Sequence, residues 1–263
     1  MNVYIFTDLE GISGIYTKEQ VLQSGTLYQE GRKYLTHDIN TVAAALKEAG
    51  VDKVYVRDGH GGGNSILYDQ LSADVDYVVQ GRTRYRFPGM EDCDALILLG
   101  YHAMAGTECA ILEHSMSSTS IQNYWINGKL AGETAIDAGI AGEFGVPVIM
   151  VTGDDKLCKE VKELLPDTVT AEVKKGLSSF GGLMLARQKA DALIREKTLE
   201  AVSKFKDGAI KPLVYDKPIT FRVEYMERIN TPSVLERPHV KLIDGRTFEV
   251  TGDNMQEAFY RSL

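Results

Sequence analysis

Up to about residue 205, short apolar runs alternate with longer segments in which apolar side chains recur every three or four residues. The short runs predict strands at Val3–Leu9, Lys53–Asp58, Asp76–Gln80, Ala95–Tyr101 and Val146–Val151. The longer segments predict helices over about Gln29–Ala49, Gly132–Phe144, Asp154–Leu165 and Gly182–Phe205. Because strands that alternate with helices usually pair in parallel, this order predicts a mostly parallel sheet with helices on both faces.

The middle and the end of the chain show a different pattern. Asn127-Gly128 inside Tyr124–Leu130 predicts a hairpin, because Asn-Gly supplies the positive φ angles of a type I′ turn. Towards the end, Ile219–Tyr225 and Val240–Val250 alternate as strands do, the second one broken by an Asp-Gly turn. A short helix is predicted at Met255–Leu263. The last part of the chain is therefore expected to form a different kind of structure from the alternating strands and helices before it.

Together these elements predict an α/β fold. We expect a three-layer αβα arrangement with a mostly parallel central sheet, plus a smaller C-terminal α+β subdomain. Residues 1–205 form the first part and residues 206–263 the second. A chain of 263 residues is long enough to bury an ample core.

The overall charge narrows the classes of partner. The formal net charge is −8 and the pI is near 5.2, which argues against binding to nucleic acid or anionic membranes, because both need a basic surface.

The first predicted strand begins almost at Met1, with no secretory signal ahead of it. Cys93, Cys109 and Cys158 lack the close spacing of a disulfide or metal motif. We therefore expect a cytoplasmic protein with reduced thiols.

Four polar residues stand at or just past the ends of three predicted strands: Asp8, Glu10, His60 and His102. In open α/β sheets, ligands collect outside the carboxyl ends of the strands. Asp8 and Glu10 are two residues apart, so in a strand they share one face, and two carboxylates at one spot repel unless a cation lies between them. Imidazoles at the same edge favour zinc over calcium or magnesium. The pattern predicts a dinuclear zinc site.

Hydrolysis of an amide by metal ions needs a polarised carbonyl and a hydroxide at neutral pH, and two cations about 3.5–4 Å apart supply both. Asp8 is expected to bridge the ions because its short side chain sits at a strand end. Glu10 can bind one ion terminally. Glu133 follows Gly132 at the start of a helix, directly after the predicted hairpin, where it can turn back toward the sheet.

Several motifs occur in a fixed order along the chain. They are Thr7–Gly14, Asp58-Gly59-His60, Leu99–Ala103, His114-Ser115-Met116, Ile126-Asn127-Gly128 with Gly132-Glu133, and Gly153-Asp154-Asp155. In order and approximate spacing they resemble the DppA-like family of zinc-dependent D-aminopeptidases over about residues 1–200. One motif alone, such as Asp-x-Glu-Gly, is weak evidence, whereas the whole set is specific.

The resemblance implies a site and an activity. Two zinc ions are expected at the positions of Asp8, Glu10, His60, His102 and Glu133, which makes residues 1–205 the metal-binding catalytic domain. A catalytic histidine is expected at the position of His114. The implied enzyme is a metallo-aminopeptidase for short peptides with an amino-terminal D-residue, such as fragments from cell-wall turnover. The family also implies a large homo-oligomer, in ring-like form, with sites that face its interior.

Other functions remain open at this point. The same metals fit an amidohydrolase or endopeptidase that acts on another small amide, or a metal-binding protein without catalytic activity. His60-Gly61-Gly62-Gly63 is similar to the oxyanion-hole loop of esterases, but that reading needs a Gly-x-Ser-x-Gly motif, which the sequence lacks.

Two further clusters each have alternative roles. Arg82, Arg84 and Arg86 face one way in an extended segment, which suits a subunit contact or a solvated edge, or alternatively a carboxylate. Asp154-Asp155 follows a strand end, where it is expected to cap the next helix, with contact to the substrate amine as the alternative.

Overall fold

The computed structural model describes residues 1–79, 85–233 and 237–263. In this part of the chain the larger sheet contains β1 (Asn2–Thr7), β2 (Lys53–Asp58), β3 (Asp76–Tyr77), β4 (Ala95–Leu99), β7 (Val148–Asp154), β8 (Val169–Ser178) and β9 (Gly181–Met184). The second sheet contains β5 (Ile121–Ile126), β6 (Lys129–Ala131), β10 (Ile219–Tyr225), β11 (Lys241–Leu242) and β12 (Thr247–Gly252). The α-helices are α1 (Lys18–Val21), α2 (Tyr28–Glu48), α3 (Glu133–Glu143), α4 (Asp155–Leu164), α5 (Arg187–Lys206) and α6 (Met255–Ser262).

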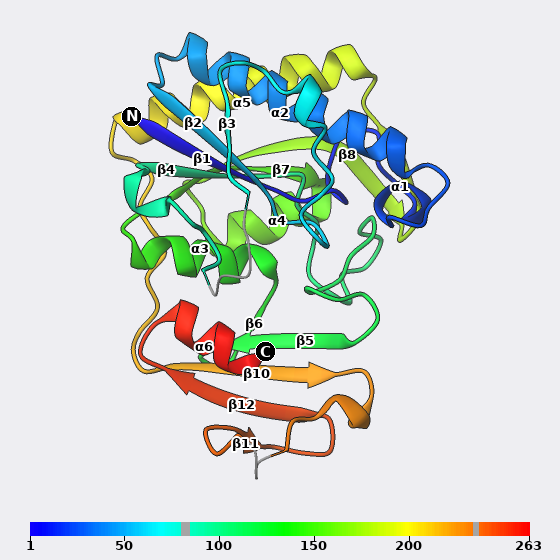
Figure 1. Ribbon diagram of the computed structural model, residues 1–263, viewed down its shortest axis with the longest axis vertical. Helices are drawn as coiled ribbons and strands as arrows, with labels where there is room; N and C mark the ends of the chain where they lie inside the picture. The colour runs from blue at the N-terminus through cyan, green and yellow to red at the C-terminus, as the bar shows by residue number, and fades with distance from the viewer. Residues whose placement is uncertain (80–84, 234–236) are drawn as a thin grey trace.

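The larger sheet has the strand order β3-β2-β1-β4-β7-β8-β9. All neighbours pair in parallel except β9, which pairs antiparallel with β8 at the edge. Helices α2 and α5 cover one face, and α3 and α4 cover the other (Figure 1). The predicted α/β fold with a mostly parallel, helix-covered sheet is confirmed.

The side chains of β1 show why the sheet is covered on both faces. Val3 and Ile5 pack into the core under α2 and α5, whereas Tyr4 and Phe6 point to the opposite face and its core. All four are essentially inaccessible to solvent. This is the two-residue period of a strand with two apolar faces, which a parallel strand between helix layers requires.

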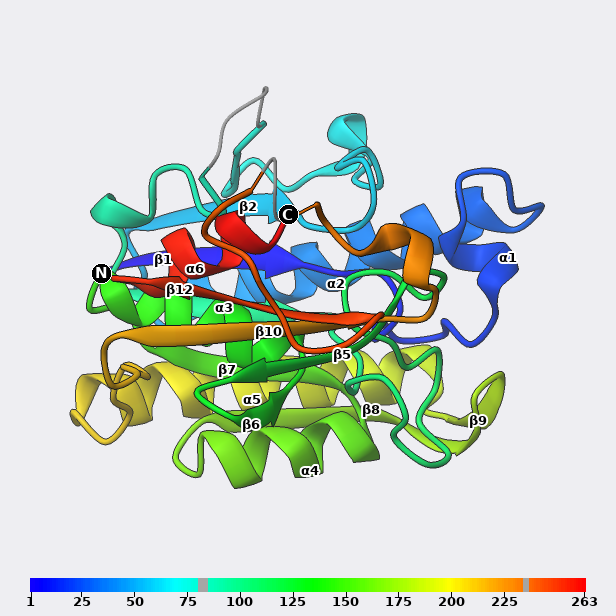
Figure 2. The same cartoon turned by 90° about the horizontal axis from the view of Figure 1, so that it is seen from below.

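The second sheet lies beyond α3, with α6 packed on it (Figures 1 and 2). In this sheet β10 lies between β12 and β5 and pairs with both. The predicted hairpin connects β5 to β6, and its turn residues Asn127 and Gly128 have φ angles of 48° and 77°. Two strands of this sheet therefore come from residues 121–131. The division into residues 1–205 and 206–263 stays a prediction.

Two expectations need correction. The helix predicted at Gly182–Phe205 begins only at Arg187, and Gly181–Met184 is the edge strand β9. A Cβ on Gly182 would lie 2.3 Å from the carbonyl oxygen of Lys175, so the close strand pairing needs glycine there. Likewise β1 ends at Thr7, so Asp8 and Glu10 lie in the following loop rather than alternating within a strand.

The arginine cluster is described only at one residue. Arg82 and Arg84 lie outside the described residues. Arg86 binds the buried carboxylate of Asp137 through two hydrogen bonds of 2.7 and 2.9 Å, and its guanidinium stacks on Phe6. For Arg86, the predicted alternative of a carboxylate contact is formed, within the chain. No helix among the described residues is long and apolar enough to span a membrane.

Candidate metal centre

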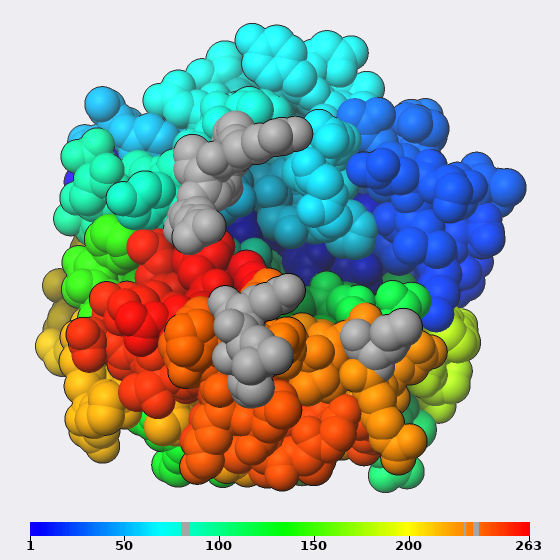
Figure 3. Space-filling model, turned by 60° about the horizontal axis from the view of Figure 1, so that its bottom comes forward, coloured from blue at the N-terminus to red at the C-terminus, as the bar shows by residue number. Residues whose placement is uncertain are grey.

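Three neighbouring strands of the sheet end at the same level. Thr7 of β1 pairs with Asp58 of β2 and with Leu99 of β4, so the loops that follow these strands meet at one edge. Close packing of the loops depends on glycine, because a Cβ on Gly11 would lie 1.7 Å from a backbone oxygen of the β4 loop. In Figure 3, dark blue residues near the N-terminus form the floor of a hollow in this region.

The first group of potential metal ligands is Asp8, Glu10 and His60. Nδ1 of His60 lies 3.0 Å from Oδ1 of Asp8 and 3.1 Å from Oε2 of Glu10. On the other side of the ring, Nε2 donates to the carbonyl oxygen of Val21 at 2.8 Å. Because a carbonyl oxygen only accepts, this contact fixes one proton on Nε2 and leaves Nδ1 directed at the two carboxylates.

The second group is His102, His114 and Glu133. Nε2 of His102 lies 3.2 Å from Oδ2 of Asp8 and 3.3 Å from Oε1 of Glu133. Its Nδ1 donates to the carbonyl oxygen of Ala103 at 3.0 Å, which again fixes the proton on the far side of the ring. A backbone carbonyl behind each imidazole is the usual orienting partner of a metal-binding histidine.

Asp8 stands between the two groups. One of its carboxylate oxygens faces His60 and the other faces His102. Two buried atoms of the cluster, Oε2 of Glu10 and Nε2 of His102, have no well-formed hydrogen bond to any described residue. Buried polar atoms are rarely left this way unless a ligand completes them. The arrangement therefore fits two cations that share Asp8.

The electrostatics of the cluster favour positive charge at both groups. Burial alone raises the pKa of Asp8, but the imidazoles of His102 and His60 outweigh it and hold the pKa of that carboxyl well below its usual value. Burial alone lowers the pKa of His60, yet Glu10 and Asp8 raise that pKa to about 12. Glu133 is also held below its usual pKa, because His102 outweighs the effect of burial.

The structure places His114 against the second group. Its ring stacks on that of His102 with a centroid distance of 3.9 Å, and Nε2 lies 3.8 Å from Oε1 of Glu133. Its Nδ1 donates to the carbonyl oxygen of Leu112 at 2.9 Å, so Nε2 is the atom that faces the site. Leu112 and Met116, two residues to either side, have φ angles of 55° and 60°. Such strained residues are common at functional sites.

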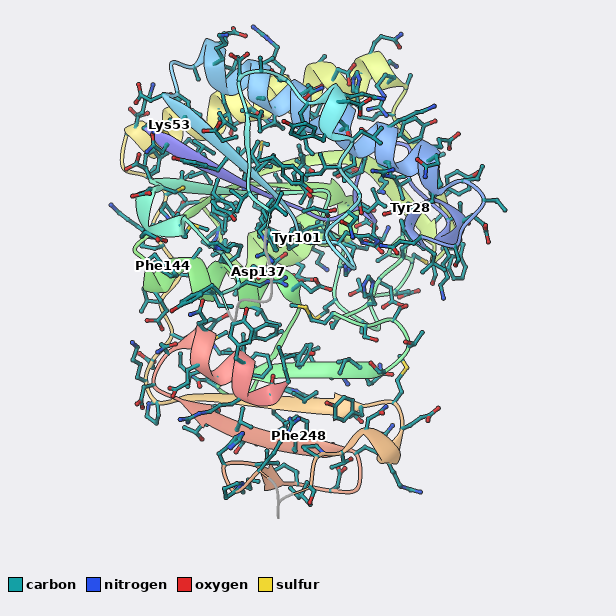
Figure 4. The ribbon with its side chains drawn as sticks, in the orientation of Figure 1. Tyr28, Lys53, Tyr101, Asp137, Phe144 and Phe248 are labelled. Atoms are coloured by element: carbon teal, nitrogen blue, oxygen red, sulfur yellow. The ribbon has the colours of Figure 1, made fainter. Side chains whose placement is uncertain are left out.

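Glu133 is held by contacts that the sequence did not reveal. It is the first residue of α3, and its Oε1 accepts a hydrogen bond from the backbone N–H of Met116 at 2.7 Å. One turn further on, Asp137 accepts a hydrogen bond of 2.6 Å from Tyr101, the residue before His102 (Figure 4). Asp137 therefore ties the helix that presents Glu133 to the loop that presents His102.

Lys174 of β8 is another residue that sequence reasoning missed. The side chain is buried, and Nζ donates to the carbonyl oxygens of Glu10, Ile12 and Ile15 at 2.5, 3.0 and 2.7 Å. Three acceptors match the three N–H donors of an ammonium group, although burial lowers the pKa of Lys174 to about 7. The ammonium group thus fixes the loop that carries Glu10. The signal in the sequence that could have pointed to this buried residue is a lysine directly after the apolar Val173.

Replacing Lys174 by methionine is expected to lower the free energy of unfolding by at least about 3 kcal/mol, because three buried carbonyls lose their donor at about 1–3 kcal/mol each. Urea denaturation measures the change. Lys175→Met is the matched control, since Lys175 is the next residue on β8 and is exposed; its effect should stay below about 0.5 kcal/mol. A Lys174→Met protein as stable as the wild type would contradict this role.

The two aspartates at the end of β7 have structural contacts. Asp154 caps α4, as predicted, and accepts hydrogen bonds from the backbone of Lys156 and Leu157. Its second oxygen accepts from Ile111 at 2.8 Å and so fixes the loop before His114. Asp155 pairs with Lys156 at 2.7 Å. Both carboxylates are therefore occupied within the chain.

Comparison with known proteins points to one family. Residues 1–262 match the model of the family Peptidase_M55, described as D-aminopeptidase. The chain is 34% identical over 224 residues to a D-aminopeptidase of Bacillus subtilis (strain 168), covering 83% of this chain and 80% of that one. A solved structure, described as Zn-dependent D-aminopeptidase DppA from Bacillus subtilis, a self-compartmentalizing protease, is also similar. It superposes with a TM-score of 0.93 at 29% identity and covers 100% of this chain and 95% of that chain. Agreement along nearly the whole length shows that this chain belongs to the D-aminopeptidase family, Peptidase_M55.

Proposed function

We propose that this protein is a dinuclear zinc aminopeptidase that hydrolyses short peptides with an amino-terminal D-residue. The observation on which the proposal rests is the pair of carboxylate–histidine groups that share Asp8. The names of the similar proteins, a D-aminopeptidase and a Zn-dependent D-aminopeptidase, support the same activity.

The residues fit two zinc ions. Imidazole and carboxylate are ordinary zinc ligands, and each imidazole is already oriented by a backbone carbonyl. Asp8, Glu10 and His60 would hold one ion, and Asp8, His102 and Glu133 the other. When bound, the two ions supply a Lewis acid for the scissile carbonyl and lower the pKa of the attacking water.

His114 has the geometry to move a proton. Its Nδ1 is committed to the carbonyl oxygen of Leu112, so Nε2 is free to take up a proton and return it to the leaving amine. Stacking on His102 holds the ring in place, with Nε2 3.8 Å from Oε1 of Glu133. We assign it to proton transfer or to stabilisation of the oxyanion.

Self-association completes the proposal. The solved relative is described as self-compartmentalizing, and we propose that this chain likewise forms a homo-oligomer, in ring-like form. Sites that face an enclosed interior would admit short peptides and exclude folded proteins. The cytoplasmic location remains a prediction from the sequence.

Hydrolysis of three dipeptides tests the activity. D-Ala-D-Ala should be cleaved at least about 10²-fold faster than both L-Ala-L-Ala and N-acetyl-D-Ala-D-Ala, because an aminopeptidase needs a free amine and the site binds one stereoisomer. Equal cleavage of the acetylated peptide would instead indicate an amidohydrolase or endopeptidase. Tight zinc binding without cleavage of any of the three would indicate a metal-binding protein without catalytic activity.

A further inference from the structure

A cavity of about 320 Å³ opens beside the metal centre. Glu10 of the first group and His114 both line it. Apolar side chains supply much of the remaining wall, namely Val21, Leu22, Leu112, Ile121, Phe180 and Met226. Ligand pockets span about 300–1,000 Å³, so this one has room only for a small molecule. Its position indicates that it receives a part of the substrate.

Lys18 brings an unpaired positive charge to this cavity. Its Nζ lies 5.6 Å from the centroid of the Phe180 ring, and it forms no ion pair or hydrogen bond with any described residue. Helix α1 and the hairpin that contains Phe180 lie at the same end of the molecule (Figure 2). Lys18 is thus a cation in a ligand cavity without an anion of its own.

The opposite charge lies next to the catalytic residues. Glu113 also lines the cavity, directly before His114, and its Oε2 accepts a hydrogen bond from the backbone N–H of Gly106 at 2.6 Å. With Glu10 it gives the cavity two carboxylates near the metal centre. Lys18 lies on α1, three residues or about 4.5 Å along the helix from Val21, whose carbonyl oxygen orients His60.

We propose that this cavity recognises short zwitterionic peptides, with Lys18 binding their C-terminal carboxylate. The inference rests on the proposed function and names the substrate class of the same site. The amino-terminal end of the peptide lies at the metal centre, where the carboxylates are. The apolar wall contacts the side chain of the leaving residue, and its carboxylate reaches Lys18 as a charge-assisted hydrogen bond. The enzyme is thereby specific for peptides that end within the cavity.

The test compares D-Ala-D-Ala with D-alanyl-D-alaninamide, which has nearly the same size but no terminal charge. For the wild type, kcat/KM should be at least about tenfold higher for the acid than for the amide. Lys18→Met should reduce this acid-to-amide ratio about tenfold, mainly through the KM of the acid, and Lys18→Arg should largely retain it. Lys53→Met is the matched control, because Lys53 is exposed at the opposite end of β2, and it should not change the ratio.

The outcomes separate this inference from the proposed function. If the wild type cleaves both dipeptides with equal kcat/KM, or if Lys18→Met leaves the ratio unchanged, the carboxylate site is wrong while the aminopeptidase activity stands. If the wild type cleaves neither dipeptide, the proposed function is wrong and this inference fails with it. A loss of the ratio in both Lys18→Met and Lys53→Met would also contradict a specific role of Lys18.

Discussion

Replacing Asp8 by alanine is expected to remove most of the bound metal and to lower hydrolysis of D-Ala-D-Ala by more than about 10³-fold. Asp8 is the residue whose two oxygens face both histidines, so its loss affects both proposed ions at once. Metal ions contribute several kcal/mol to stabilisation of the transition state, and each 1.4 kcal/mol corresponds to about a factor of ten in rate. Metal analysis and kinetics on the same preparation measure the two effects together.

The fold is expected to survive this change, because Asp8 lies in a loop after β1 and contributes little to either apolar core. Circular dichroism and the oligomeric state check that. Asp69→Ala is the matched control, an exposed aspartate outside both groups, and it should retain metal and activity. Two tightly held zinc ions in the Asp8→Ala protein would show that Asp8 does not bridge them.

Replacing His114 by alanine is expected to separate chemistry from metal binding. The variant should keep both metals and its oligomeric state, while kcat falls by about 10²–10⁴-fold, the usual contribution of a positioned acid–base group. The reason is geometric. Five other residues already supply the ligands of the proposed ions, and Nε2 of His114 faces the site from beside those ligands. Steady-state kinetics with metal analysis measures both parts of the prediction.

His114 is close enough to the second group for a different role to be tested by the same variant. Its ligand atom lies within 4.8 Å of those of His102 and Glu133. Loss of one zinc from His114→Ala would make His114 a ligand and would change the proposed set. Turnover at the wild-type rate would instead make the ring structural. His37, a histidine exposed on α2 and paired with Asp191, provides the control variant His37→Ala.

The sequence predicted the site best where a metal-binding residue type stands at the end of a predicted strand. The three strand ends beside Asp8, His60 and His102 could be located because apolar runs stop there, and parallel strands deliver their ends to one edge. Glu133 was harder to place, because its approach depends on the hairpin before it and on the contact with Met116. Proximity in space of these residues was therefore predictable, but the contacts that orient them were not.

Buried polar partners were the main omission. Asp137 lies in the predicted helix α3, whereas Lys174 lies in β8, which was not among the predicted strands. The roles of both residues depend on carbonyls and side chains far away in sequence. Asp154 illustrates the intermediate case: its cap on α4 is local and was predicted, whereas its bond to Ile111 is long-range and was not. Hydrophobic periodicity reports burial, and it carries no information on which distant acceptor a buried polar group meets.

The edge of the larger sheet shows a second kind of error. The apolar residues of Gly181–Met184 extend the helical spacing of α5, so the periodicity alone favoured one long helix. Pairing with β8 decides the outcome instead, because the backbone at Gly182 lies too close to Lys175 for any side chain. Tertiary contact overrides local preference most easily in short segments of this kind.

The most direct test of the account is a zinc titration of the chelated enzyme with D-Ala-D-Ala hydrolysis as the readout. The account predicts about two zinc ions per chain in the purified protein, loss of hydrolysis on chelation, and recovery that is complete after about two equivalents of zinc. Full turnover from a metal-free preparation, or recovery complete after one equivalent, would contradict a centre in which Asp8 joins two ions.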